Sequence, residues 1–199
     1  GIPVLFNSVA RRCFYQAPVE NDDDEKLRKT TFAGEEKINS NTLIDTHGAY
    51  VVAPRNVARR LNVSFVDATK ITHDIETELG IEGSRKLHMW FRPGECPQIP
   101  KGRQDNTHYN VYGARLVANA LADEIGKQVP ELKKHVRHYD YVVSTRGRGN
   151  YFTLQDAVDA VPAGKRVKVL VLDGSWKKPE NMKGKKIKFI LQFGAKITD

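Results

Sequence analysis

Hydrophobic and polar positions change pattern several times within the first 67 residues. The β-branched and apolar run from Ile2 to Val9 is typical of a buried parallel strand. Residues 14–43 are mainly polar, and the charged stretch 20–29 has too little apolar content for a core element, which predicts a surface insertion. A second run at 62–67 predicts another short strand.

Three helices are predicted around these strands. Apolar residues recur at helical spacing up to Leu61, and Pro54 in that stretch fits only in a first helical turn. Residues 68–79 and 112–129 form the second and third candidate helices, with a proline-containing loop at 92–104 between them. This order is that of an α/β layered domain, of which we expect only half a sheet, since two strands are predicted.

A second unit is predicted to begin near Tyr139. A strand at 141–143 precedes a glycine-rich turn and a short amphipathic helix at 153–161. Two further strands are expected at 166–172 and 186–193, where charged and apolar residues alternate.

The net charge of +8 is concentrated in the last third of the chain. Residues 131–199 hold 15 Lys and Arg against 7 Asp and Glu, whereas residues 1–130 hold 17 of each. Such a surface attracts polyanions, namely nucleic acid, acidic lipid or acidic polysaccharide, and the alternative is a solvated lysine-rich face.

Other classes of function have little support in the sequence. No apolar run is long enough to span a bilayer, and the first residues lack the basic segment and cleavage site of a signal peptide. Cys13 and Cys96 are compatible with one disulfide or with none. His73, His88, His135 and His138 form no metal-ligand pattern with cysteines or acids, so we predict no metal and no cofactor.

Asp105 and His108 are the candidate catalytic residues. A serine esterase needs an imidazole that takes the serine proton and a carboxylate that fixes the imidazole tautomer. The two side chains are three residues apart in one predicted loop, and they converge only if that loop makes a tight turn. The small residues from Gly113 onward could seat the loop against a sheet. The competing interpretation is an aspartate that caps a helix, with a surface histidine.

Three other residues are candidates for a role in a functional site. His47 follows an acid and precedes a glycine, but a helix N-terminus explains that pattern better. Arg11 and Arg12 follow the first strand, at the end where α/β sites gather, and are candidate ligands of an acidic substrate.

The run DNTHYNVYGARLVANALADEI resembles the last block of the SGNH, or GDSL, hydrolases, specifically the rhamnogalacturonan acetylesterase-like carbohydrate esterases. PVLFNSVARRCF and LIDTHGAYVVAPRNVARRLNVSFVDAT resemble a late strand and the following helix and strand of that family. The resemblance covers residues 1–130. It implies the C-terminal half of a flavodoxin-like α/β/α sandwich, acetyl ester hydrolysis on pectic chains, Asp105 as orienting acid and His108 as general base.

The family's nucleophile motif and its oxyanion-hole motifs are missing from the sequence. None of the six serines lies in a Gly-Asp-Ser or Gly-x-Ser-x-Gly motif, and the similar Asp-Gly-Ser at 173–175 follows the histidine. We therefore expect this chain alone to be inactive.

The run DYVVSTRGRGNYFTLQDAVDAVPAGKRVKVLVLDGSW resembles the opening of pectin methylesterases, which implies the first rungs of a right-handed parallel β-helix at 139–199. Residues 131–138 are then a linker. The Arg-Gly repeat at 146–149 is also compatible with RNA binding, but it is a single copy without an aromatic and basic platform.

The sequence thus predicts a fragment of a pectin-acting esterase, with a non-catalytic polysaccharide-binding module as the alternative. Its expected partners are an acidic plant polysaccharide and the missing N-terminal part of its own domain, with no nucleic acid and no membrane. The substrate class implies a secreted, periplasmic or cell-surface protein.

Overall fold

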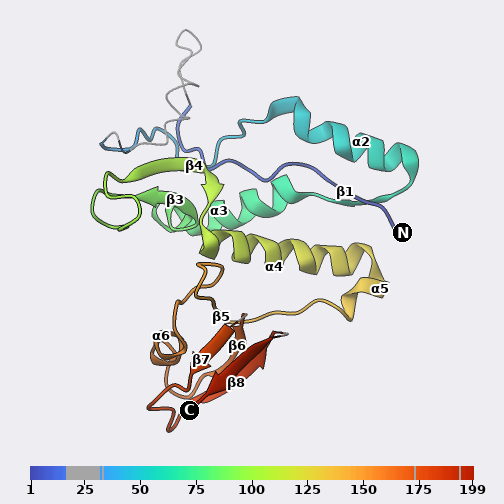
Figure 1. Ribbon diagram of the computed structural model, residues 1–199. Coiled ribbons are helices and arrows are strands. Elements are labelled where there is room, and N and C mark those ends of the chain that lie inside the picture. Colours follow the sequence, from blue (N-terminus) through green and yellow to red (C-terminus); the bar gives the residue numbers. More distant parts are fainter. Residues whose placement is uncertain (17–31, 33, 173, 193) are drawn as a thin grey trace. The chain divides into compact units, whose positions relative to one another are not determined.

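The structure, a computed structural model, describes residues 1–16, 32, 34–172, 174–192 and 194–199 (Figure 1). The chain forms two compact units, Gly1–Val136 (unit 1) and Arg137–Asp199 (unit 2). The insertion predicted at 20–29 lies outside the described residues. No helix of the described parts is both long and apolar enough to cross a membrane.

Unit 1 begins with two parallel strands that are shorter than predicted. β1 (Val4–Phe6) pairs with β2 (Ser64–Val66), and Leu5 lies opposite Phe65. Between them run η1 (Gly48–Val51) and α2 (Val52–Leu61). Pro54 lies in the first turn of α2, where its fixed φ and missing N–H are tolerated.

The next helix continues beyond its predicted end. α3 spans Ala68–Arg85 and is interrupted at Gly80, whose φ of 66° and ψ of −171° are not helical. The prediction located this break correctly but not the turn that follows it. α4 (Val111–Gln128) matches its prediction to one residue at each end, and α5 (Pro130–Lys133) occupies the start of the segment predicted as a linker.

The expectation of only two strands in unit 1 is wrong. β3 (His88–Phe91) and β4 (Arg103–Tyr109) form an antiparallel pair, so the predicted loop at 92–104 is mostly the connection within a hairpin. The sequence of β4 is polar and does not indicate a strand, and its one buried residue is Asp105. Unit 1 is a mixed α/β arrangement, compatible with an SGNH-like α/β domain.

Apolar side chains near β1 remain open to solvent. Ile2 is 58% exposed, Phe6 38% and Tyr50 88%, although parallel strands are usually covered on both faces. We expect the 199-residue chain to self-associate at micromolar concentrations through this surface. Light scattering coupled to size exclusion tests this: the double variant Ile2→Ser/Phe6→Ser should shift toward the monomer, and a wild-type chain that stays monomeric would contradict the expectation.

Unit 2 is built from parallel strands, and two of its strands escaped prediction. Its elements are β5 (Tyr141–Val143), α6 (Leu154–Asp159), β6 (Arg166–Val171), β7 (Gly174–Lys177), β8 (Lys186–Leu191) and β9 (Ala195–Thr198). β7 and β9 were missed because each contains only one large apolar residue, Trp176 and Ile197 respectively. The strands pair in the orders β5-β6-β8 and β7-β9, all parallel.

The core of unit 2 lies between these strands and α6. It contains Leu154 from α6, alternate residues of β6 and the nearly enclosed ring of Trp176. The indole N–H of Trp176 donates to the Leu172 carbonyl at 2.9 Å. Parallel stacking of this kind is what a parallel β-helix requires, and the β-helix itself stays a prediction.

Candidate active site

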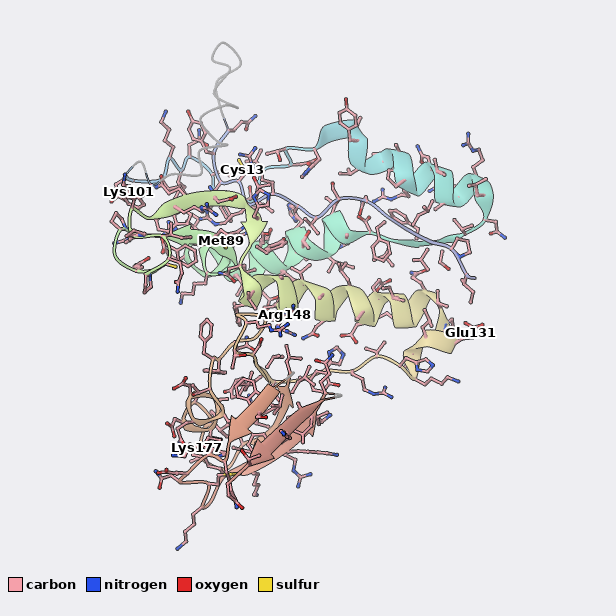
Figure 2. All side chains as sticks on the ribbon, in the orientation of Figure 1. Cys13, Met89, Lys101, Glu131, Arg148 and Lys177 are labelled. Carbon is pink, nitrogen blue, oxygen red and sulfur yellow. The ribbon has the colours of Figure 1, made fainter. Side chains whose placement is uncertain are left out.

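Asp105 and His108 lie in β4, where the strand leaves its regular pairing. Asp105 is opposite Met89 (labelled in Figure 2), yet the next pair in the ladder joins Tyr109 to His88. Three residues of β4 are therefore looped out across one step of β3. In a regular strand, side chains three apart point to opposite faces, and this irregularity turns His108 back toward Asp105.

The two side chains are joined by a hydrogen bond. His108 Nδ1 lies 2.8 Å from Asp105 Oδ2. The other carboxylate oxygen, Oδ1, accepts the backbone N–H groups of Thr107 at 2.9 Å and His108 at 3.0 Å. The aspartate thus holds both the backbone of the turn and the imidazole ring.

The two residues of the pair differ in their exposure to solvent. The Asp105 side chain is 6% exposed, whereas that of His108 is 74% exposed. Burial raises the pKa of Asp105, but the N–H groups of His108 and Thr107 and the His108 ring outweigh it, so the pKa lies below the usual value. An anionic Asp105 that accepts from Nδ1–H leaves Nε2 as the proton acceptor, which is the arrangement a general base requires.

Asp105 is not the cap of the following helix. The N-cap of α4 is Asn110, whose Oδ1 accepts the N–H of Gly113 at 2.9 Å. The amide of Asn110 donates to the carbonyl groups of Lys86 and His88. The competing interpretation of Asp105 therefore does not apply, because another residue performs the capping.

Gly113 allows α4 to pack directly on the chain before β3. A Cβ built on Gly113 would lie 2.1 Å from the carbonyl oxygen of Leu87, which is backbone and has no rotamer to change. The small residue predicted to seat the turn is required at this contact.

We expect Gly113→Ala to destabilise the chain by about 1–3 kcal/mol, since the added methyl forces α4 away from Leu87. Gly126→Ala in the same helix is the matched control. Its Cβ would meet a Val136 methyl group at 3.2 Å, and the better helix propensity of alanine should make it neutral or slightly stabilising. Urea unfolding measures both, and equal effects of the two substitutions would contradict the assigned role of Gly113.

Arg12 serves inside the fold. Its side chain is fully buried and forms an ion pair with Glu36. Its guanidinium also donates to Ser84 Oγ at 3.0 Å, to the Ile81 carbonyl at 2.9 Å and to Asn106 Oδ1 at 2.8 Å. No part of this guanidinium faces solvent, so direct binding of a substrate, as predicted from the sequence, does not fit its position.

The Arg12 cluster holds the turn that carries the candidate pair. Asn106, which follows Asp105, accepts from Arg12 and donates to Glu36 Oε1 at 3.0 Å. The backbone N–H of Arg12 also donates to the Asn106 carbonyl. Arg85 forms a second ion pair with Glu36 at 3.0 Å, and its guanidinium lies over the Trp90 ring. The turn is thereby fixed to the segment that follows β1, to α3 and to the segment around residue 36.

The electrostatics of Glu36 follow from these contacts. Burial raises the pKa of Glu36. The hydrogen bonds and charge of Arg12, together with the hydrogen bonds of Arg85 and Asn106, lower it by more, so the pKa lies below the ordinary value. Sequence reasoning missed Glu36 altogether. The one sequence feature that could have indicated an acidic partner is Arg12 itself, which lies next to an apolar run, because a buried arginine requires a partner.

A second set of polar groups, also missed, lies buried beside the turn. His88 Nε2 lies 3.0 Å from Glu76 Oε1, and both side chains are fully enclosed. Tyr109 donates its hydroxyl to the same oxygen at 2.9 Å, and burial together with the Glu76 charge raises the pKa of Tyr109. These bonds fix the end of β4 to α3.

Arg11 and His47 are the other two candidates from the sequence. Arg11 is half-buried. His47 is the N-cap residue of η1, but its side chain makes no capping hydrogen bond. Its backbone N–H donates to the Asp45 carboxylate. Both cysteines are free thiols. Across the residues that the structure describes, no group of three or more His, Cys, Asp and Glu side chains could hold a metal ion.

Known proteins include one clear relative over part of the chain. Rhamnogalacturonan acetylesterase RhgT of Bacillus subtilis (strain 168) is 36% identical over 91 residues, which are 46% of this chain. The chain resembles a carbohydrate esterase. The match spans only 39% of the length of that enzyme. No family model matches, no solved structure matches significantly, and the pectin methylesterase resemblance at 139–199 receives no support.

Proposed function

We propose that this chain carries the acid and base residues of a serine carbohydrate esterase that removes acetyl groups from a rhamnogalacturonan-type pectic chain. The observation that carries the proposal is the 2.8 Å bond between exposed His108 and buried Asp105. The partial identity to a rhamnogalacturonan acetylesterase supports the substrate class.

The proposed reaction is acyl transfer in two steps. His108 Nε2 removes the serine proton as the serine oxygen attacks the acetyl carbonyl carbon, and the resulting imidazolium is stabilised by Asp105. His108 then gives the proton to the departing sugar oxygen as the ester bond breaks. In the second step His108 Nε2 takes a proton from water as the water oxygen attacks the acetyl-serine carbonyl, and it returns that proton to the serine oxygen as acetate leaves.

The serine itself is proposed to lie outside these 199 residues. In the part of the chain that the structure describes, no serine hydroxyl is hydrogen-bonded to the His108 ring, whose one side-chain partner is Asp105. Ser84, for example, accepts a hydrogen bond from the Arg12 guanidinium at 3.0 Å. The nucleophile and the oxyanion donors are thus assigned to additional polypeptide.

Unit 2 is proposed to be the beginning of a pectin methylesterase-like right-handed β-helix. Its parallel strand pairs and the Thr153-capped α6 that precedes β6 support this proposal. The intact protein would then act on acetyl and methyl esters of one acidic polysaccharide. From this substrate class we further propose that the protein is secreted, periplasmic or at the cell surface.

A second candidate is a polysaccharide-binding module without chemistry. It is favoured by the missing serine partner of His108 among the described residues. The two candidates differ in one observable, the release of acetate.

The proposal is tested by measuring acetate released from acetylated rhamnogalacturonan. The protein expressed from the complete open reading frame that contains these residues should release acetate and be inhibited by a serine-directed phosphonate. The 199-residue chain alone should release none. A complete protein that binds the polysaccharide but releases no acetate would support the non-catalytic candidate instead.

A further inference from the structure

Four cationic side chains stand in two neighbouring rows on the solvent face of unit 2. Arg166 and Lys168 alternate with buried residues along β6, and Lys186 and Lys188 alternate with half-buried residues along β8. The strands pair in parallel with Arg166 opposite Lys186 and Lys168 opposite Lys188. We call these four residues the cationic ladder.

No ion pair neutralises the side chains of the ladder, although the Asp140 carboxylate accepts the backbone N–H of Lys168 at 2.8 Å. All four side chains are exposed. Among the residues with described positions, none of the four side chains forms an ion pair or a hydrogen bond, although the ion pairs of unit 2 include other lysines. Two like-charged pairs directly opposite each other therefore face water.

The fold of unit 2 does not explain this arrangement. Like charges opposite each other on neighbouring strands are destabilising. Lysines on an edge strand such as β8 do prevent association with other strands. Lys168, however, has both edges of β6 occupied, since β8 pairs on one side and on the other its backbone N–H and carbonyl bond to the carboxylate and the N–H of Asp140. No free edge needs protection there, so a binding role fits this residue better.

We infer that the cationic ladder binds the carboxylates of an acidic, uronic acid-containing polysaccharide, an inference that rests on the proposed function. Neighbouring strands are about 4.8 Å apart, and alternate residues along a strand are about 6.6 Å apart. The ladder thus presents a compact grid of charge to a linear polyanion. The next position on the same face of each strand is apolar, Leu170 on β6 and Ile190 on β8, and offers surface to the C–H groups of sugars.

Nucleic acid fits this face less well. Single-stranded nucleic acids are held by aromatic side chains on which bases stack, together with cations. The paired rows Arg166–Lys186, Lys168–Lys188 and Leu170–Ile190 contain no aromatic side chain.

Other lysines of unit 2 provide a matched comparison. Lys177 (labelled in Figure 2) and Lys178 line a cavity of about 580 Å³ beside β7. Lys178 is paired with Asp199 at 2.8 Å, and Lys177 lies 3.6 Å from Glu180. Their charges are compensated locally, so they should contribute little to polyanion binding, although they count equally in the net charge.

The test is calorimetric binding of the 199-residue chain to de-esterified polygalacturonate at low salt. Lys168→Gln/Lys188→Gln should weaken binding at least tenfold, and Lys177→Gln/Lys178→Gln less than twofold. Lys168→Arg/Lys188→Arg should retain binding, which distinguishes loss of charge from loss of folding. Fully methyl-esterified polygalacturonate, which is neutral, should not bind the wild-type chain.

Three results would overturn the inference. Equal weakening by both glutamine pairs would mean that net charge alone attracts the polymer. Unchanged binding of the ladder variant would place the site elsewhere, and a preference for polyuridylate over polygalacturonate would identify a nucleic acid surface. Because binding is measured without catalysis, ladder-dependent binding combined with a complete protein that releases no acetate would overturn the proposed function and leave this inference standing.

Discussion

In the proposed esterase, His108→Ala should lower the rate constant for acetate release by about 10³-fold, since the positioned base of an acyl transfer contributes about 10²–10⁴. The substitution should leave folding intact, because the ring is largely exposed and one hydrogen bond to Asp105 is lost. His47→Ala is the control, since no hydrogen bond or ion pair among the described residues joins His47 to Asp105 or His108, and its rate should stay within about twofold of the wild type.

Asp105→Asn should reduce the rate by a similar factor for a different reason. An asparagine Oδ1 still accepts the N–H groups of Thr107 and His108, so the turn survives. Its amide, however, donates to His108 Nδ1 and forces the proton onto Nε2, where it blocks general base action. A variant of either residue that keeps more than half of the wild-type rate would contradict the assigned roles.

Arg12→Met should destabilise the chain by about 3–5 kcal/mol, because it leaves the Glu36 carboxylate in the cluster without its main partner. The same substitution at Arg55 is the control. Arg55 forms an ion pair with Asp67, but its side chain is 43% exposed, and exposed pairs contribute only about 0–1 kcal/mol. Urea unfolding of both variants gives the comparison, and similar losses would show that the Arg12 cluster does not stabilise unit 1.

The Arg12 cluster also predicts a pH dependence with a definite sign. The pKa of Glu36 is lower in the folded chain than its ordinary value of 4.5, so its contribution is present above that value and lost as the pH falls through the folded pKa. The free energy of unfolding of the wild type should therefore decrease below about pH 4.5. Arg12→Met should show a smaller decrease over the same range, because the favourable charge is gone.

The sequence predicted the elements whose hydrophobic pattern is strong. α4 alternates over 18 residues, and its ends were predicted within one residue. β4 could not be recognised, because the residues between Arg103 and Tyr109 are polar and its stability comes from backbone pairing with β3. β7 and β9 contain one large apolar residue each, so no alternation is visible in them, and Trp176 is the one buried residue of β7.

The candidate site was predictable in part. The identities of Asp105 and His108 followed from chemistry and resemblance, and their direct contact is found in the structure. The looped-out residues that bring them together depend on the register with β3, which the sequence does not encode locally. The burial of Arg12 against Glu36 joins residues 24 positions apart, and the Arg12 bond to Asn106 spans 94, so these contacts required the fold.

The central claim is that Asp105 fixes the His108 tautomer that can act as a base. Ring ¹⁵N chemical shifts of His108 in the 199-residue chain, recorded at about pH 8.5 and above the ordinary histidine pKa of about 6.5, report this tautomer directly. The account predicts a protonated Nδ1 and an unprotonated Nε2 in the wild type, with the reverse in Asp105→Asn. A wild-type ring that is protonated mainly at Nε2, or that is unaffected by Asp105→Asn, would contradict it.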